Sequence, residues 1–299
     1  MTSISPSLSR RDWTNVVAVL CVLAATAIFS LIFISGRVVG DLASPLQIMF
    51  LRYCGGLLTV CAIAGLNGRN WASMQSEHRV SQALRALAGG LGGAAIIFGN
   101  AHMPLVDANA IGLLSGVFTL GLGYIVFRDR LPGPGIAGAL ACIAGAAIVM
   151  AARGAFTTLD ASYLFPASIV AVGALLLATE HVFIKILAMS DRPLVTLAHA
   201  NFFGAILLLI PALLTWRSTG PVNAALLCLG PFAILGQYLN IRGYMAASVS
   251  LLAPVGYSSL VFAALWGWWF FGQLPTAGVI AGCLVIAAGG TVLALSRHK

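Results

Sequence analysis

The residues of this chain that could do chemistry are few, and several lie inside long apolar stretches. Glu180 and His181 fall in the stretch from about 162 to 184, and Lys185 follows directly after it. Ionisable groups are costly inside an apolar stretch of this length and therefore indicate function by default. One interpretation is a Glu180–Lys185 contact near the interface, and the other is a proton-coupling site or a site for the amine of a solute.

Two further ionisable residues lie within apolar stretches. Arg52 is expected to have a structural role, either reaching the interface with its charged end or bonding to helix-end carbonyls. The alternative is that it contacts a carboxylate of a bound solute. His199 is expected to be a packed histidine with one hydrogen bond.

Neutral polar residues recur at helical spacing and form the better candidates for a binding wall. Gln237, Asn240 and Tyr244 are three and four residues apart, so they share one helix face. Such a stripe serves either hydrogen bonding between helices or the binding of a solute, and the spacing fits both. The candidate binding residues are Ser30, Phe98, Asn100, Asn109, Ser115, Glu180, His181, Gln237, Asn240, Tyr244, Tyr257 and Ser258.

The residues needed for intramembrane hydrolysis, nucleotide binding or metal binding do not occur in the required patterns. The sequence contains no His-Glu-x-x-His cluster for an intramembrane hydrolase and no G-x-x-x-x-G-K-[ST] nucleotide loop. The six cysteines match no metal-ligand spacing and are expected to behave as small apolar residues. We therefore expect neither enzymatic activity, nor a catalytic residue, nor a metal, nor a cofactor.

The elements that must position these residues are membrane spans. The chain is 60% hydrophobic and 8% charged, whereas about 25% of the residues of a soluble domain are charged. About twenty apolar residues suffice for a helix to cross the roughly 30 Å of a bilayer core. The sequence therefore predicts an all-α membrane protein in a lipid bilayer, with ten spans near 15–35, 46–66, 82–100, 107–127, 134–152, 162–184, 194–216, 223–241, 249–271 and 275–296.

The net charge of +8 indicates topology, because the basic residues stand singly between apolar runs and form no nucleic-acid-binding patch. With both termini inside, twelve basic residues face the cytoplasm and three face outward, and this bias predicts cytoplasmic termini. The outer three are Arg37, Arg153 and Arg217. The inner twelve are Arg10, Arg11, Arg69, Arg79, Arg85, Arg128, Arg130, Lys185, Arg192, Arg242, Arg297 and Lys299.

The two halves of the chain contain a similar segment at the same place in the order of spans. The segment after the fourth stretch reads LPGPGI from Leu131, and the segment after the ninth reads LPTAGV from Leu274, 143 residues later. Two copies of an odd number of spans must have opposite orientations in the membrane, an arrangement known from secondary transporters. We expect two inverted five-helix repeats, residues 1–155 and 156–299.

Four segments carry a family resemblance. They are Pro45 followed by Arg52, Val117-Phe118-Thr119, the exit from Phe127 to Leu131, and VFAALWGW from Val261 to Trp268. In order and spacing the chain resembles the drug/metabolite transporter superfamily in its ten-helix form with two EamA-type repeats. It departs at Ile28-Phe29-Ser30, where the family has Trp-Gly-Ser, and at Gly272-Gln273-Leu274, where the family has Glu-Arg-Leu.

This resemblance implies a monomeric transporter of the inner membrane. Its central cavity would be lined by helices 1, 3, 4, 6, 8 and 9, and it would export amino acids, including aromatic ones, or related metabolites by alternating access. The alternatives are a membrane scaffold protein, or a transporter of drugs, nucleoside-like metabolites or lipid-linked sugars.

Overall fold

The structure, a computed structural model, describes residues 10–68, 75–103, 105–128, 133–154, 161–217, 220–272 and 274–295. Within these ranges the chain forms helices and no strand. The first half contains α1 (Arg10–Val39), η1 (Gly40–Leu42), α2 (Pro45–Leu66), α3 (Arg79–His102), α4 (Leu105–Gly112), α5 (Leu114–Phe127) and α6 (Gly133–Ala152). The second half contains α7 (Ala161–Ser190), α8 (Pro193–Leu214), α9 (Gly220–Leu227), α10 (Leu229–Ala246), α11 (Val249–Leu252), η3 (Ala253–Ser258), α12 (Ser259–Phe271) and α13 (Ala277–Leu295).

These helices confirm the predicted membrane architecture. Among the described residues, nine helical segments are long and apolar enough to cross a membrane, and a shorter apolar helix spans Ala277–Leu293. Large apolar side chains in the middle of helices, such as Leu140, Val172 and Leu284, are exposed on the flanks of the bundle. Lipid is the solvent in which such a surface is stable, since it offers the same environment as a protein core.

Three of the ten spans are interrupted. The fourth consists of α4 and α5, which meet at Leu113, and the eighth consists of α9 and α10, which meet at Cys228. The ninth contains the tight helix η3 between α11 and α12, and Pro254 lies within it. Proline lacks a backbone N–H and its ring crowds the preceding turn, so the regular helix ends there.

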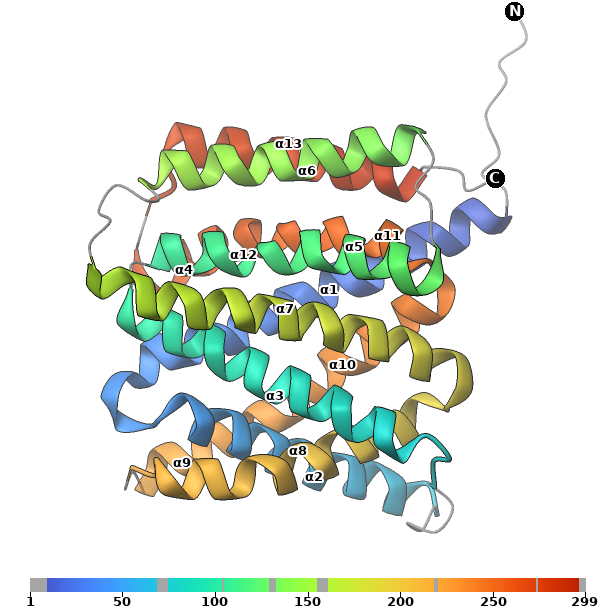
Figure 1. Cartoon of the computed structure of the whole chain (residues 1–299), viewed down its shortest axis with the longest axis vertical. Coiled ribbons are helices and arrows are strands. Elements are labelled where there is room, and N and C mark those ends of the chain that lie inside the picture. The colour runs from blue at the N-terminus through green and yellow to red at the C-terminus, as the bar shows by residue number, and fades with distance from the viewer. Residues whose placement is uncertain are drawn as a thin grey trace, which may run out of the picture.

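The helices form layers that run from one edge of the bundle to the other (Figure 1). The pair α6 and α13 lies at one edge, and α2, α8 and α9 lie at the opposite edge. Glycines let the backbones of α6 and α13 approach closely. A Cβ added at Gly138 would lie 2.9 Å from the carbonyl oxygen of Gly289, and one added at Gly145 would lie 2.8 Å from that of Gly282. Helices in lipid associate through such close backbone approaches.

The contacts between helices follow the two inverted repeats. Counted as spans, the third packs on the sixth as α3 on α7, and the eighth packs on the first as α10 on α1. The second pairs with the seventh as α2 with α8, and the fifth pairs with the tenth as α6 with α13. Exchanging the first five spans for the last five leaves this pattern unchanged. The predicted boundary at residue 155 lies outside the described residues and stays a prediction.

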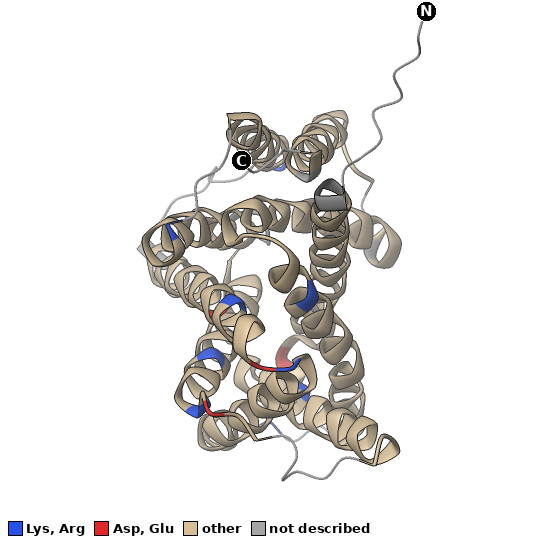
Figure 2. Ribbon diagram, turned by 90° about the vertical axis from the view of Figure 1, so that its right-hand side faces the viewer, with Lys and Arg blue, Asp and Glu red and all other residues tan. Residues whose placement is uncertain are grey.

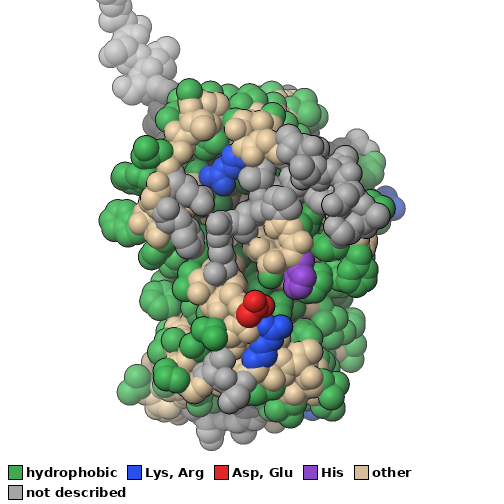
Figure 3. Space-filling view, turned by 90° about the vertical axis from the view of Figure 1, so that its left-hand side faces the viewer, with side chains coloured by type: hydrophobic (Ala, Val, Ile, Leu, Met, Phe, Trp, Pro, Cys, Tyr) green, Lys and Arg blue, Asp and Glu red, His purple; other side chains and the backbone are tan. Residues whose placement is uncertain are grey.

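The two ends of the bundle differ in their side chains. Figure 2 looks onto the end where α1 begins and α7 ends, and Lys185, Arg192 and Arg242 belong to the segments near this end. Figure 3 shows the opposite end, where a few charged side chains and a histidine lie amid hydrophobic ones. We call these the predicted inner and outer ends, and their orientation in a membrane stays a prediction.

Candidate binding cavity

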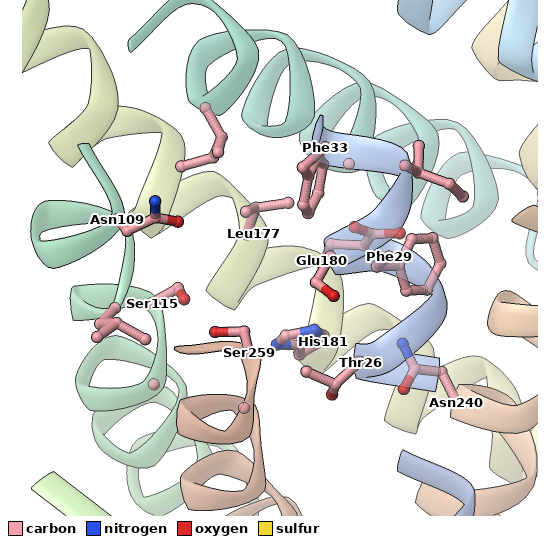
Figure 4. A pocket seen from close by; sticks show the side chains of 18 of the residues that line it. Thr26, Phe29, Phe33, Asn109, Ser115, Leu177, Glu180, His181, Asn240 and Ser259 are labelled. Carbon is pink, nitrogen blue, oxygen red and sulfur yellow. The ribbon is translucent and has the colours of Figure 1, made fainter. Parts of the chain in front are cut away.

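A cavity of about 230 Å³ lies in the middle of the bundle. Spans 1, 3, 4, 6, 8 and 9 contribute to its wall, as expected, and α2 and Arg153, the residue after α6, contribute as well. Figure 4 shows Asn109 and Ser115 on one side of this space, with Phe29 and Phe33 of α1 opposite them. Ten of the twelve candidate residues line the cavity: Ser30, Asn100, Asn109, Ser115, Glu180, His181, Gln237, Asn240, Tyr244 and Tyr257.

Phe98 and Ser258 lie outside the cavity lining. Phe98 stacks on the ring of His102, with the ring centroids 4.0 Å apart. Ser258 is buried in η3, whereas its neighbours Tyr257 and Ser259 face the cavity. Consecutive residues of a tight helix point in different directions, so Tyr257 and Ser258 do not share a face. A binding role for any of the twelve residues stays a prediction.

The polar stripe on α10 faces the cavity as its spacing predicts. The side-chain oxygen of Gln237 accepts a hydrogen bond from the amide of Asn201 on α8, at 3.3 Å. The ring of Tyr244 stacks on His181 with 5.7 Å between the centroids. The Nδ1 of His181 lies 3.4 Å from the hydroxyl of Thr119 on α5. The stripe therefore serves contacts between helices and the cavity wall at the same time.

Two neutral polar groups of the wall lack a partner among the described residues. The side-chain oxygen of Asn100 and the hydroxyl of Tyr257 are buried without a hydrogen bond from the described residues. Tyr257 is held against Gly116, where a Cβ would lie 3.0 Å from the ring. A buried polar group without a partner is unfavourable, so both groups are available to a polar solute or to water.

Ser30 fixes a neighbouring helix. Its hydroxyl donates to the carbonyl of Ala27 at 2.9 Å and accepts from the indole N–H of Trp266 at 2.9 Å. This bond turns the ring of Trp266 on α12 toward α1. Trp268 and Trp269 are exposed, as residues of an aromatic belt at a membrane interface are.

The ion pair of Glu180 involves a residue from another helix. Its carboxylate lies 4.0 Å from Nε of Arg85 on α3, a residue that the charge count had assigned to the inner surface. Arg85 is fully buried. Lys185, the partner considered from the sequence, donates from Nζ to the carbonyls of Tyr244 and Ala247 at 2.7 and 2.8 Å. It thus caps the end of α10, where carbonyl groups favour a cation.

Arg52 also departs from expectation, because it lines the cavity together with Met49 and Tyr53 of the same helix. Sequence reasoning placed the second helix outside the cavity wall and favoured a structural role for this arginine. Spacing along α2 carries no signal that could have corrected this, since the cavity-facing side of a buried helix is set by the packing of its neighbours. His199, by contrast, is buried and bonds to the carbonyl of Val195 at 3.0 Å, as expected.

The cavity is asymmetric along the bundle axis. At the predicted outer end its lining extends to Arg153, which follows the last residue of α6. Toward the inner end it stops at Ile184, Tyr244 and Leu252, all almost completely buried. Beyond them Asp191 accepts hydrogen bonds from Ser76 and Gln82, at 2.6 and 2.8 Å, and ties the start of α3 to the end of α7. The cavity therefore extends toward the predicted outer end, and the side toward the predicted inner end is packed.

The chain matches a family model described as the EamA-like transporter family, once over residues 16–151 and again over 164–295. The pseudopaline exporter CntI of Pseudomonas aeruginosa is 25% identical over 258 residues, covering 85% of this chain and 86% of its own. A probable terminal-alkyne amino-acid exporter of Streptantibioticus cattleyicolor is 29% identical over 200 residues, 64% of each chain. One solved crystal structure superposes on this chain with a TM-score of 0.72. Its sequence is 20% identical, and the match covers 96% of each chain, which shows a shared fold.

Proposed function

The chain belongs to the EamA-like transporter family, and we propose that it is a secondary transporter that exports amino acids, aromatic ones included, or related small metabolites. The observation that carries this proposal is the central cavity, whose wall combines aromatic rings with polar groups that lack a partner. Pockets for small ligands are built in this way, from apolar walls and a few placed polar groups. One relative named above is an exporter of pseudopaline and the other a probable exporter of a terminal-alkyne amino acid, which supports a small metabolite or amino acid as the solute here.

The dimensions of the cavity agree with a small solute. Its volume of about 230 Å³ lies just below the roughly 300–1,000 Å³ that is usual for ligand pockets. Phe29 and Phe33 stack with centroids 6.5 Å apart and offer an apolar surface to a side chain. Asn100 and Tyr257 offer an acceptor and a hydroxyl to polar groups of the solute.

We infer an alternating-access mechanism in which the two repeats rock about this cavity. The structure has the form expected when the cavity faces outward, because the packed residues and the Asp191 hydrogen bonds lie on the inner side. An inward-facing form would have to break these bonds, which join the start of α3 in the first repeat to the end of α7 in the second. We further propose that the protein acts as a monomer in the inner membrane with both termini in the cytoplasm.

A flux screen tests the proposal. The purified chain is reconstituted in proteoliposomes, and uptake of each of the twenty amino acids is measured with and without a pH gradient. We expect saturable uptake of a subset that includes aromatic amino acids. Empty vesicles provide the control. A chain that moves none of them would contradict the proposal and favour a scaffold role or another solute class.

A further inference from the structure

Arg52 is a buried guanidinium that faces the cavity. It lies seven residues after Pro45, the first residue of α2, and seven residues correspond to about 10 Å along a helix. Its exposed fraction is only 3%, and its Nε and Nη1 atoms are buried without a hydrogen-bond partner among the described residues. Its guanidinium carbon lies 3.9 Å from the centre of the Tyr53 ring, and this contact helps to fix its plane.

A structural role does not account for these contacts. An arginine that reaches the interface is exposed at its charged end, and one that caps a helix donates to carbonyls. Arg52 is buried, and its Nε and Nη1 donate to no carbonyl in the described part of the chain. The adjacent Tyr53 joins the helices instead: its hydroxyl donates to the carbonyl of Ala86 at 3.3 Å, and its ring packs against Gly204 of α8.

Among the described side chains, the positive charges near Arg52 outnumber the negative ones. Glu180 is the carboxylate that lines the described part of the cavity, and it is already paired with Arg85. Two buried guanidinium groups therefore share one carboxylate. Removing a charge from water without a partner is costly, and a well-placed opposite charge offsets much of that cost. The cavity is accordingly prepared to receive one more negative charge beside Arg52.

We propose that Arg52 binds the carboxylate of the transported solute, so that the solute class is amino acids and other small carboxylates. This inference rests on the proposed function and specifies its chemistry. The planar guanidinium matches a carboxylate with two parallel N–H groups, a geometry that an ammonium group cannot offer. Phe29 and Phe33 face the apolar part of the solute.

The test compares each amino acid of the flux screen with its own carboxamide, which lacks the negative charge. We expect the wild-type chain to prefer the acid by at least about tenfold in KM, because hydrogen bonds between charged groups are the strong ones. Arg52→Gln should raise KM for the acid by a similar factor and leave uptake of the carboxamide unchanged. Arg52→Lys should restore part of the preference, since it keeps the charge and loses the paired N–H groups.

Arg217→Gln is the matched control, because it removes a guanidinium that pairs with Asp41 at the outer end. It should leave the acid-to-carboxamide ratio unchanged. The wild-type ratio itself needs no variant, so the inference stays testable even if Arg52→Gln fails to fold. A wild-type chain that moves acid and carboxamide equally, an Arg52→Gln chain that keeps the preference, or inhibition by inorganic phosphate in place of carboxylates would overturn this inference alone. A wild-type chain that moves no amino acid would overturn the proposed function and this inference together.

Discussion

At the scale of single residues, the buried charges of the bundle depend on one another. Arg85 is fully buried, and the carboxylate of Glu180 is its ion-pair partner at 4.0 Å. A Cβ at Gly89 would lie 2.5 Å from that carboxylate, so glycine is what lets α3 approach α7 here. Removing one partner of a buried pair leaves the other charge uncompensated, which is strongly destabilising. Glu180 therefore has a structural task that is independent of proton transfer.

The first prediction concerns coupling. We expect Glu180→Gln to lower the melting temperature in detergent, because Arg85 loses its partner, and to leave the shape of the flux profile between about pH 5.5 and 8.5 unchanged. Glu77→Gln is the control, since it removes a carboxylate from the exposed surface. A wild-type pH dependence that disappears in a folded, solute-binding Glu180→Gln chain would show instead that Glu180 carries the proton.

The second prediction concerns the two tyrosines of the wall. Tyr244→Ala and Tyr257→Ala each remove a ring from the cavity, and we expect uptake to fall about tenfold or the solute preference to change. Tyr257→Phe keeps the ring against Gly116 and removes only the unpaired hydroxyl. If that hydroxyl serves the solute, Tyr257→Phe raises KM without lowering stability. Folded alanine variants with unchanged transport and preference would exclude both residues from the site.

How far the sequence predicts the site can be judged from α10 and α2. Gln237, Asn240 and Tyr244 are found on one face because a helix repeats every 3.6 residues, and this is local information. That Arg52 faces the cavity, and that Arg85 pairs with Glu180, depends on which helices pack against one another in the fold. Residues from α2, α3 and α7 are far apart in the chain, so no spacing rule brings them together.

At the scale of elements, hydropathy predicts all ten spans because each must cross the same thickness of lipid. It does not predict the interruptions at Leu113 and Cys228, which leave the apolar pattern intact. The tight helix around Pro254 also shifts the angular position of Ser258. This is why a residue predicted for the wall lies outside it.

The third prediction concerns the glycines between α6 and α13. A Cβ at Gly289 would lie 2.7 Å from the carbonyl oxygen of Gly138, whereas one at Gly290 would meet nothing within 4 Å. We expect Gly289→Ala to destabilise the fold by about 1–3 kcal/mol, as overpacking does. Gly290→Ala on the same helix should be neutral or slightly stabilising. Thermal unfolding in detergent measures both, and equal melting temperatures would contradict the close packing of this pair.

At the scale of the whole molecule, the pairing of helices explains how two similar halves make one cavity. The first span packs on the eighth and the sixth on the third, so each half completes its wall with helices of the other. The cavity therefore lies between the repeats, and a rocking motion that separates them at one end closes them at the other. The hydrogen bonds of Asp191 with Ser76 and Gln82 join the two halves at the predicted inner end, so a motion that separates the repeats at that end must break them.

The fourth prediction concerns the orientation of the chain in the membrane. It follows from the distribution of basic residues and from the number of spans between the two termini. Arg85 is buried in α3, so eleven of the twelve basic residues assigned inward remain against three outward, and the bias persists. A fusion of alkaline phosphatase after Lys299 should be inactive, because this enzyme folds only outside the cytoplasm. A phosphatase fusion to a chain truncated after Gly154, which follows the fifth span, should be about tenfold or more active than the fusion after Lys299. Fusions of a fluorescent protein that folds only in the cytoplasm should give the opposite pattern. Phosphatase activity after Lys299 would place the termini outside the cytoplasm. It would also reverse the assignment of the inner and outer ends of the cavity.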